Sequence, residues 1–334
     1  MKLGKVPPEI LEKLLQKIPV NDPRVLLGPQ VGEDVALIDM GPRVLVAKTD
    51  PITFATDLIG WYAVNVNAND VACAGARPRW FLATLLMPQN STSQTVASIF
   101  QQLTDACASL DVTLIGGHSE VTRSVTQAVV VGCMLGEVDK DRAITTAGAR
   151  VGDSIVVTKG ISLEGSALLA RERRPDLEAA GLSPALIDEA RDLLFNPGIS
   201  VVKDALTACD AVLVHSLHDP TEGGLATGLW EVANAAGVGM VVQQDKIPIF
   251  PQCRAICDAL GLDPLGLLAS GSLLVALPPG EVAPLLQALS AEGIQAYEIG
   301  RVTPPEEGIL MEASGKLRPL PTFQRDELAR YFEA

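Results

Sequence analysis

Five acidic residues lie at turns or at the edges of predicted apolar elements, where their carboxylates could act together. They are Asp34, Asp50, Asp70, Glu120 and Asp219. Carboxylates that converge on one cleft repel each other unless a cation neutralises them. Oxygen ligands favour Mg²⁺ or Ca²⁺ over soft metals, and a Mg²⁺ ion with few protein ligands usually shares nucleotide phosphates. Each acid alone is more often a helix cap or a solvated end, so it is their combination that suggests a metal and phosphate site.

The helix predicted at residues 63–78 is apolar almost all round but has polar residues in its middle. These are Asn65, Asn67, Asn69 and Asp70. Helix interiors usually avoid Asn and Asp, because their short side chains compete for backbone hydrogen bonds. Asn67 and Asp70 are three residues apart and share a face, and Gly75 and Pro78 are expected to end the helix. A buried acid with amide neighbours suggests a metal or phosphate site; the alternative is a helix cap misread as a helix interior.

Two glycine pairs could bind phosphate through their backbone N–H groups. Gly116-Gly117 and Gly223-Gly224 each follow a predicted strand. A glycine pair between a strand and a helix exposes N–H groups with no Cβ in the way, although most such pairs are simple turns. The sequence contains no G-x-x-x-x-G-K-[ST] motif and no G-x-G-x-x-G motif that opens a helix. A conventional NTPase loop or dinucleotide-binding fold is therefore not supported.

Basic side chains could complete a phosphate site. Lys48 and Lys159 stand at the ends of predicted strands and could neutralise phosphate charge, or they could be ordinary surface lysines. His118 could contact phosphate or act as an acid or base, or it could be a hydrogen-bonded turn residue. His215 and His218 form an H-x-x-H pair that spans a strand-to-loop transition. Because this pair lacks a helical frame, it does not favour zinc.

The composition indicates a globular enzyme of two domains. The chain has 334 residues, of which 48% are hydrophobic, 20% charged and 4% aromatic. This length suggests two domains, and the low aromatic content fits an α/β or α+β enzyme better than a β-sandwich. The net charge is −14. An acidic protein gains nothing from counterion release, so we expect no nucleic-acid partner.

The sequence predicts a cytoplasmic protein. Its longest apolar runs are strand-length, so no membrane span is expected. The N-terminus has charges inside its apolar pattern and resembles an amphipathic helix rather than a signal peptide. We expect reduced core cysteines rather than disulfides or a zinc site. The cysteines are Cys73, Cys107, Cys133, Cys209, Cys253 and Cys257.

Hydrophobic periodicity divides the chain into two halves that meet at about residues 147–151. The first half has the predicted order β-β-α-β-α-β-β, which indicates a mixed α/β layer with its helices on one face. Its strands are expected at 32–39, 43–47, 79–87, 112–115 and 125–135, and its helices at 63–78 and 91–110, after a helix at 8–18. The second half is expected to have strands at 154–158, 212–215, 238–242, 272–277 and 295–299. Its helices are expected at 162–170, 199–208, 225–236, 252–260 and 282–291, with a charged, exposed helical segment at 171–192 and a short polar helix at the end.

The order of five motifs resembles a known family. GEDVAL, KTD, N-x-N-x-N-D-x-x-x-x-G-x-x-P, GGHSEV and HDPTEGGL follow one another between about Gly32 and Gly300. They are similar to the ATP-binding superfamily of aminoimidazole ribonucleotide synthetase (PurM), which includes selenophosphate synthetase, thiamine monophosphate kinase and the hydrogenase maturation family HypE. The resemblance is greatest to HypE, whose HDPTRGGL is close to HDPTEGGL.

The resemblance implies a two-domain PurM-like fold. Residues 1–150 would form an N-terminal α/β domain with a mixed sheet, through which the protein would form a homodimer. Residues 151–334 would form an α+β domain. ATP and Mg²⁺ would bind in a cleft between the two domains.

The resemblance also implies roles for individual residues. The metal ligands would be Asp34, Asp50, Asp70 and Asp219. The nucleotide would contact Thr49, Asp50, Asn65, Asn69, Gly116, Gly117, Gly223 and Gly224. Catalytic roles would belong to Lys48, Asp70 and His118, with Asn69 orienting Asp70.

The family chemistry is transfer of an ATP phosphate to a carbonyl-type oxygen. In HypE it dehydrates a C-terminal cysteine thiocarboxamide to a thiocyanate. This sequence has no cysteine after Cys257, so we expect no self-modification of that kind. It has His118 where HypE has an aspartate of a Gly-Gly-Asp-Thr motif, and histidine is a poor Mg²⁺ ligand, although selenophosphate synthetase shares it. The sequence shows none of the N-terminal Cys or Sec loop of selenophosphate synthetase, so we do not expect selenide chemistry.

Two hypotheses follow. The first is a Mg²⁺- and ATP-dependent enzyme that phosphorylates an amide- or carboxylate-type oxygen of a small molecule or a protein. The second is a non-catalytic nucleotide-binding or scaffold protein that has kept the fold.

Overall fold

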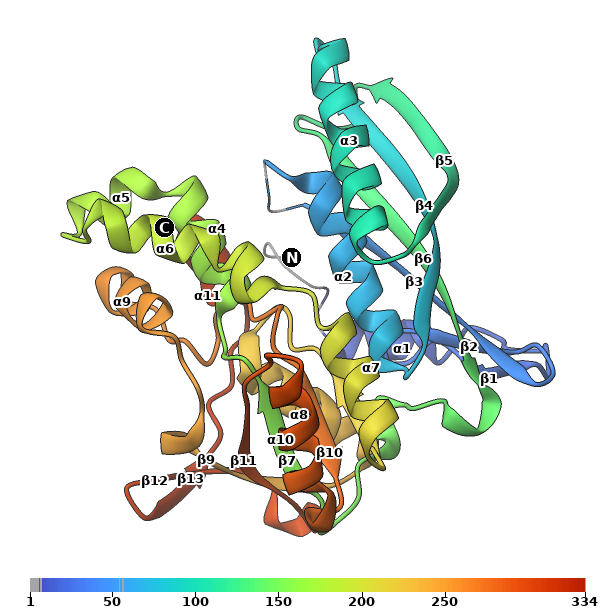
Figure 1. Ribbon diagram of the computed structural model, residues 1–334, viewed down its shortest axis with the longest axis vertical. Coiled ribbons are helices and arrows are strands. Elements are labelled where there is room, and N and C mark those ends of the chain that lie inside the picture. Colours follow the sequence, from blue (N-terminus) through green and yellow to red (C-terminus); the bar gives the residue numbers. More distant parts are fainter. Residues whose placement is uncertain (1–5, 7, 54, 56, 334) are drawn as a thin grey trace. The chain divides into compact units, whose positions relative to one another are not determined.

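The computed structural model describes residues 6, 8–53, 55 and 57–333, and it divides into two compact units (Figure 1). The N-terminal unit comprises residues 20–29 and 34–143. The C-terminal unit comprises the described residues up to 19, residues 30–33 and those from 144 onward. The division into domains 1–150 and 151–334 stays a prediction. In the described part of the chain, no helix has both the length and the apolar character that a membrane span requires.

The N-terminal unit contains a six-stranded mixed sheet, in the order β1-β2-β3-β6-β4-β5. The strands are β1 (Val25–Leu27), β2 (Ala36–Asp39), β3 (Arg43–Ile52), β4 (Arg77–Pro88), β5 (Thr113–Thr122) and β6 (Val129–Asp139). Only β4 and β5 pair in parallel; the other neighbours are antiparallel. Along β6, buried and partly exposed residues alternate, as expected for a strand with one covered face.

Two helices cover that face. α2 (Ile59–Cys73) packs on β3, β4 and β6, and α3 (Ser93–Ser109) packs on α2 and β5 (Figure 1). The expected arrangement of helices on one face is therefore confirmed. Because α2 lies between the sheet and α3, it is buried on almost all sides, which explains its apolar sequence. Its polar residues lie inside the helix, so the interpretation as a misread cap is wrong.

Some boundaries differ from the prediction. α2 ends at Cys73 ahead of Gly75, which has a positive φ of 72°, and Pro78 is already part of β4. α3 is capped by Thr92 rather than by Ser91, because the Thr92 side chain accepts from the backbone N–H of Thr95. β3 continues to Ile52, so Lys-Thr-Asp lies within the strand and not at its end.

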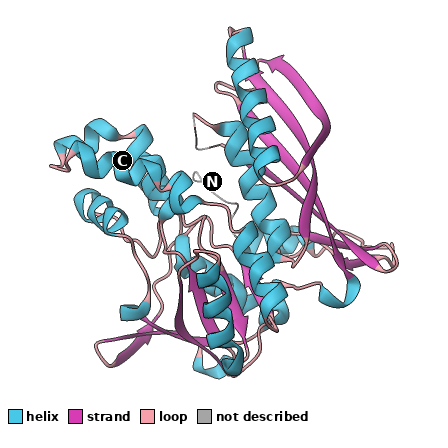
Figure 2. Ribbon diagram, in the orientation of Figure 1, coloured by secondary structure: helices cyan, strands magenta, loops and turns pink. Residues whose placement is uncertain are grey.

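The C-terminal unit contains a seven-stranded sheet, in the order β13-β12-β9-β11-β7-β10-β8. The strands are β7 (Ser154–Thr158), β8 (Ser216–His218), β9 (Gly239–Gln243), β10 (Leu274–Leu277), β11 (Ala296–Thr303), β12 (Ile309–Ala313) and β13 (Lys316–Pro319). β12 and β9 are parallel, and the other pairs are antiparallel. The helices are α1 (Pro8–Leu15), α4 (Leu163–Glu172), α5 (Arg174–Ala179), α6 (Pro184–Asp192), α7 (Val202–Ala211), α8 (Gly224–Ala236), α9 (Pro251–Leu260), α10 (Val282–Ala291) and α11 (Glu327–Phe332). Figure 2 shows both sheets beside their helices.

The core of the C-terminal unit lies between this sheet and α8. Buried residues of β7, β9 and α8 form one cluster, to which Val157, Leu229 and Val242 belong. The strand expected at 212–215 is wrong, because β8 begins at Ser216. The segment 171–192 is not fully exposed, since Leu177 and Ile187 are buried.

Candidate functional site

An ion-pair cluster in the N-terminal unit joins four of the predicted site residues. Lys48 and Asp50 are two residues apart on β3 and so lie on one face of the strand. Asp70 comes from α2, and Asp34 precedes β2. The Lys48 Nζ atom lies 3.1 Å from Asp70 Oδ2, 3.2 Å from Asp50 Oδ2 and 3.9 Å from Asp34 Oδ1. The structure therefore brings together three of the four predicted metal ligands and one predicted catalytic lysine.

The cluster carries a net negative charge and is only partly buried, because the side chains of Asp34 and Asp50 are 34% and 40% exposed. The side chain of Lys48 is 11% exposed and that of Asp70 only 3%. Burial alone would lower the pKa of the Lys48 ammonium, but the carboxylates of Asp70, Asp34 and Asp50 outweigh burial and raise this pKa above its ordinary value. The lysine is thus charged, and three carboxylates surround one ammonium.

These residues fit a hard divalent cation. Carboxylate oxygens of Asp34 and Asp70 lie within 4.8 Å of each other. The donors are all oxygens, which is the set that Mg²⁺ prefers. The Lys48 ammonium already occupies a cation position among them, so the arrangement is one that attracts positive charge.

Asn67 fixes the backbone of β3 at Asp50. Its Oδ1 accepts from the Asp50 N–H at 2.9 Å, and its Nδ2 donates to the Asp50 carbonyl at 3.3 Å and to the Ala63 carbonyl at 2.8 Å. The predicted shared face of Asn67 and Asp70 is confirmed, because both side chains face β3. Gly132 on β6 provides the space that the Asn67 side chain needs, because a Cβ at this position would lie 2.5 Å from Asn67 Nδ2. No motif in the sequence indicated this role of Gly132.

Two other predicted nucleotide contacts near the cluster, Asn65 and Thr49, form hydrogen bonds within the protein. Asn65 donates from Nδ2 to the Trp61 carbonyl of its own helix, at 2.9 Å. Thr49 donates its hydroxyl to the Gly132 carbonyl at 2.7 Å. Asn69 is fully buried beside Asp70 in the chain. Their nucleotide roles stay predictions.

Gly116 and Gly117 lie within a strand, so the expectation that the strand ends at residue 115 and turns at these glycines is wrong. Both are part of β5, and Gly117 pairs with Ala83 of β4. A Cβ on Gly117 would lie 1.9 Å from the Ala83 carbonyl oxygen. This glycine therefore allows close approach of two strands, and the predicted phosphate roles of Gly116 and Gly117 stay predictions.

His118 is not brought to the Lys48 cluster within this unit. It lies on β5, and β6 and β4 separate β5 from β3. At the usual spacing of neighbouring strands, this places the two backbones roughly 14 Å apart. The His118 Nε2 atom lies 3.4 Å from Glu120 Oε2, and both side chains are exposed.

Gly223 and Gly224 begin α8 as predicted, but their N–H groups have partners. The Gly223 N–H donates to Asp326 Oδ2 at 2.6 Å, and the Gly224 N–H donates to the Thr221 carbonyl at 3.1 Å. The other Asp326 oxygen accepts from the Leu328 N–H at 2.7 Å. Burial raises the pKa of Asp326 to about 7. The Gly223 N–H is thus already bonded to a carboxyl group of the chain, and the nucleotide roles of Gly223 and Gly224 stay predictions.

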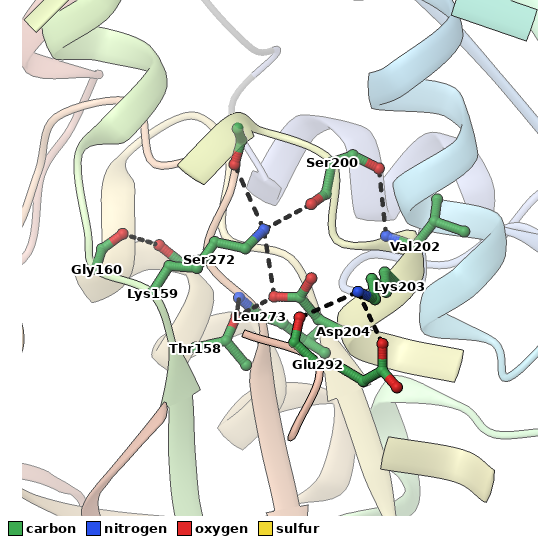
Figure 3. A network of polar contacts seen from close by, with 11 residues as sticks. Thr158, Lys159, Gly160, Ser200, Val202, Lys203, Asp204, Ser272, Leu273 and Glu292 are labelled. Atoms are coloured by element: carbon green, nitrogen blue, oxygen red, sulfur yellow. Dashed lines mark hydrogen bonds and ion pairs between the residues drawn. The ribbon is translucent and has the colours of Figure 1, made fainter. Parts of the chain in front are cut away.

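Lys159 is buried rather than exposed at the end of β7 (Figure 3). Its Nζ donates to the Ser200 carbonyl at 2.6 Å and lies 3.2 Å from Asp204 Oδ1. Thr158 donates its hydroxyl to the same carboxylate at 2.7 Å. Burial lowers the pKa of Lys159, and Asp204 partly offsets this. The interpretation of Lys159 as an ordinary surface lysine is therefore wrong, because its side chain binds the Ser200 carbonyl and Asp204 of α7. Its role toward phosphate stays a prediction.

The remaining titratable residues around β8 also have partners. His215 Nδ1 lies 2.9 Å from Asp153 Oδ1, and His218 Nε2 lies 3.0 Å from Glu231 Oε2. Asp219 follows β8 and is buried in the C-terminal unit. Its role as a metal ligand stays a prediction.

Comparison with known proteins identifies the family. Residues 32–138 match the model of the AIR synthase related protein N-terminal domain, and residues 150–312 match that of the C-terminal domain. The carbamoyl dehydratase HypE of Cupriavidus necator is 31% identical over 284 residues, covering 81% of this chain and 77% of that protein. A putative hydrogenase expression/formation protein of Methanocaldococcus jannaschii is 28% identical over 318 residues, covering 92% and 91%.

The fold leads to the same family. A crystal structure of the hydrogenase maturation protein HypE in complex with ATP superimposes with a TM-score of 0.69 at 25% identity, covering 92% of each chain. The predicted two-domain PurM-like fold is confirmed. The chain belongs to the family of AIR synthase related proteins, and its relatives include HypE.

Proposed function

We propose that this protein is a magnesium-dependent enzyme that transfers the γ-phosphoryl group of ATP to a carbonyl-, amide- or carboxylate-type oxygen. The observation that carries this proposal is the cluster of Asp34, Asp50 and Asp70 around Lys48. Support comes from a relative that is a carbamoyl dehydratase and from a similar structure that holds ATP. The acceptor belongs to a small molecule or to a protein.

The aspartates would hold Mg²⁺, which neutralises phosphate charge when it is bound. Asn67 keeps Asp50 in place through two backbone hydrogen bonds, so the cluster is preorganised. Lys48 supplies a positive charge for the transferring phosphoryl group. In the transfer, the bond from the γ-phosphorus to its bridging oxygen breaks, a bond to the acceptor oxygen forms, and ADP leaves. With a carboxamide acceptor, the amide loses protons and later expels phosphate, which leaves a nitrile-type product.

The second candidate is a nucleotide-binding scaffold without turnover. It is favoured by the placement of His118 on a different strand from Lys48, since this separates two of the predicted catalytic residues within the unit. We also propose the cytoplasm as the compartment, because none of the six cysteines, all of them in the described residues, forms a disulfide.

ADP release separates the two candidates. We would measure it with Mg²⁺, with and without carboxamide- and carboxylate-bearing acceptors, in the wild type, in Asp70→Asn and in Asp111→Asn. Asp111 is a matched control, because its side chain is 91% exposed. An enzyme loses turnover in Asp70→Asn and keeps it in the control. If the wild type binds ATP but does not turn it over, and Asp70→Asn changes only the affinity for ATP, the protein is a nucleotide-binding scaffold and not an enzyme.

A further inference from the structure

We propose that Lys48 is a built-in counter-ion that makes metal binding depend on nucleotide. Without nucleotide, its ammonium holds the carboxylates of Asp50 and Asp70 and weakens the binding of free Mg²⁺. When nucleotide binds, the Lys48 ammonium pairs with its phosphates instead, and the carboxylates become available to the metal. This inference rests on the proposed function, since it concerns the same aspartates.

The geometry makes the ammonium and a metal ion competitors. Lys48 Nζ lies at 3.1–3.2 Å from one oxygen each of Asp70 and Asp50. Mg²⁺ would be held by the carboxylates of these same aspartates, so it would need the space that the ammonium now takes. Two cations held by the same two oxygens repel each other, because the short distances leave no room for water between them. One of them must therefore leave when the other binds.

Hydrogen bonds hold the backbone next to Lys48, whereas its side chain can move. The strand on which it stands is fixed directly after it, by the Thr49 hydroxyl on Gly132 and by Asn67 on the backbone of Asp50. The lysine itself has a flexible four-carbon stem, so its ammonium can shift while β3 stays in place. Phosphate oxygens offer this ammonium an alternative set of negative partners. Nucleotide and metal then bind cooperatively, and the effect of each on the other is equal.

A purely structural lysine would behave differently. If Lys48 did no more than neutralise buried acids, its removal would destabilise the protein without changing how nucleotide and metal affect each other. If it competes with the metal, its removal tightens the binding of free metal. The direction of the change in metal affinity distinguishes the two.

The test is titration of Mn²⁺, followed by electron paramagnetic resonance, into the full-length protein with and without a non-hydrolysable ATP analogue. The variants are Lys48→Met, which keeps the length of the side chain, and Lys140→Met as a control. Lys140 pairs with Asp39 on the same sheet, outside the cluster. We expect Lys48→Met to bind free Mn²⁺ about tenfold more tightly than the wild type, and the control to bind it unchanged. The analogue should tighten Mn²⁺ binding by about tenfold in the wild type and by much less in Lys48→Met.

Equal or weaker binding of free Mn²⁺ by Lys48→Met would overturn the inference. If this variant does not fold, the wild type still decides, because Mn²⁺ affinity that is the same with and without the analogue contradicts the competition. A wild type that binds no analogue at all refutes the proposed function. In that case, the comparison of free Mn²⁺ binding between wild type and Lys48→Met still decides the role of Lys48.

Discussion

Lys48 is surrounded by three aspartates because α2 packs on β3. The helix brings Asp70 to 3.1 Å from the Lys48 ammonium, and Asp50 lies on the same strand as Lys48. Asp34, which precedes β2, is the third carboxylate near the ammonium. Because this arrangement depends on side-chain direction across several elements, residue types and periodicity alone do not predict it.

Asn67 is expected to be more important for stability than Asn65. Asn67→Ala leaves the Asp50 N–H without its acceptor, whereas Asn65→Ala removes a bond within one helix. A buried polar group without a partner costs about 1–3 kcal/mol. Urea unfolding should therefore show a loss for Asn67→Ala that exceeds that of Asn65→Ala by about 1–2 kcal/mol. Equal losses would refute the role given to Asn67.

Glu164 should make the C-terminal unit less stable as the pH rises. Burial raises the pKa of Glu164 to about 7, and the nearby carboxylates of Asp326, Glu222 and Asp219 add to the effect. In the unfolded chain its pKa is about 4.3, so the folded state binds the proton more tightly. Its contribution is fully present below about pH 4 and is lost as the pH rises to about 7.

The variant Glu164→Gln, which cannot ionise, tests this. Its free energy of unfolding should exceed that of the wild type by about 1–3 kcal/mol at pH 8 and equal it near pH 4. The control is Glu307→Gln, at an exposed position. The expectation fails if the difference between wild type and Glu164→Gln is the same at both pH values.

At the scale of elements, the glycine pairs were the least predictable. Glycine favours turns, and nothing local distinguishes a turn from a strand that needs a small residue for a close neighbour. The close neighbour of Gly117 is on β4, and the partner of Gly223 is Asp326, which is 103 residues away. The strong apolar periodicity of α3, α8 and α10, by contrast, predicted these helices to within a few residues.

Gly117→Ala should separate β5 from β4. The new Cβ would meet the Ala83 carbonyl at 1.9 Å, while a Cβ on Gly116 meets nothing within 4 Å. Both glycines have similar positive φ values, 149° and 153°, so Gly116→Ala controls for backbone strain. We expect Gly117→Ala to cost at least about 2 kcal/mol more, with faster hydrogen exchange in β4 and β5. Similar costs for the two variants would contradict the close approach of these strands.

At the scale of the whole molecule, composition and length predicted two parts, and each has its own sheet. Five ordered motifs led from the sequence to the family, because their residue types are specific even where their local structure is not. The hairpin of β12 and β13 was missed, since its Pro-rich surroundings hide a short alternating pattern. We expect the segment after Asp50 to help build the pocket of the acceptor, and residues 54 and 56 of this segment lie outside the described residues.

The proposed homodimer should form through β5. This strand is at the edge of its sheet, and Ile115 and Val121 are 51% and 63% exposed there. An apolar edge strand with unpaired backbone groups favours pairing with a second copy. Sedimentation at micromolar concentration should find a dimer for the wild type and a monomer for Val121→Lys. A wild-type monomer would refute the prediction.

The most direct test of the magnesium and ATP proposal is thermal unfolding with Mg²⁺ and ATP, in the wild type, in Asp70→Asn and in the exposed control Asp111→Asn. A ligand at 100 times its dissociation constant stabilises a protein by about 2.7 kcal/mol. We predict that Mg²⁺ and ATP together raise the melting temperature of the wild type and of the control, that chelation of Mg²⁺ abolishes the rise, and that Asp70→Asn largely loses it. No rise in the wild type, or a rise that survives both chelation and Asp70→Asn, would contradict the account.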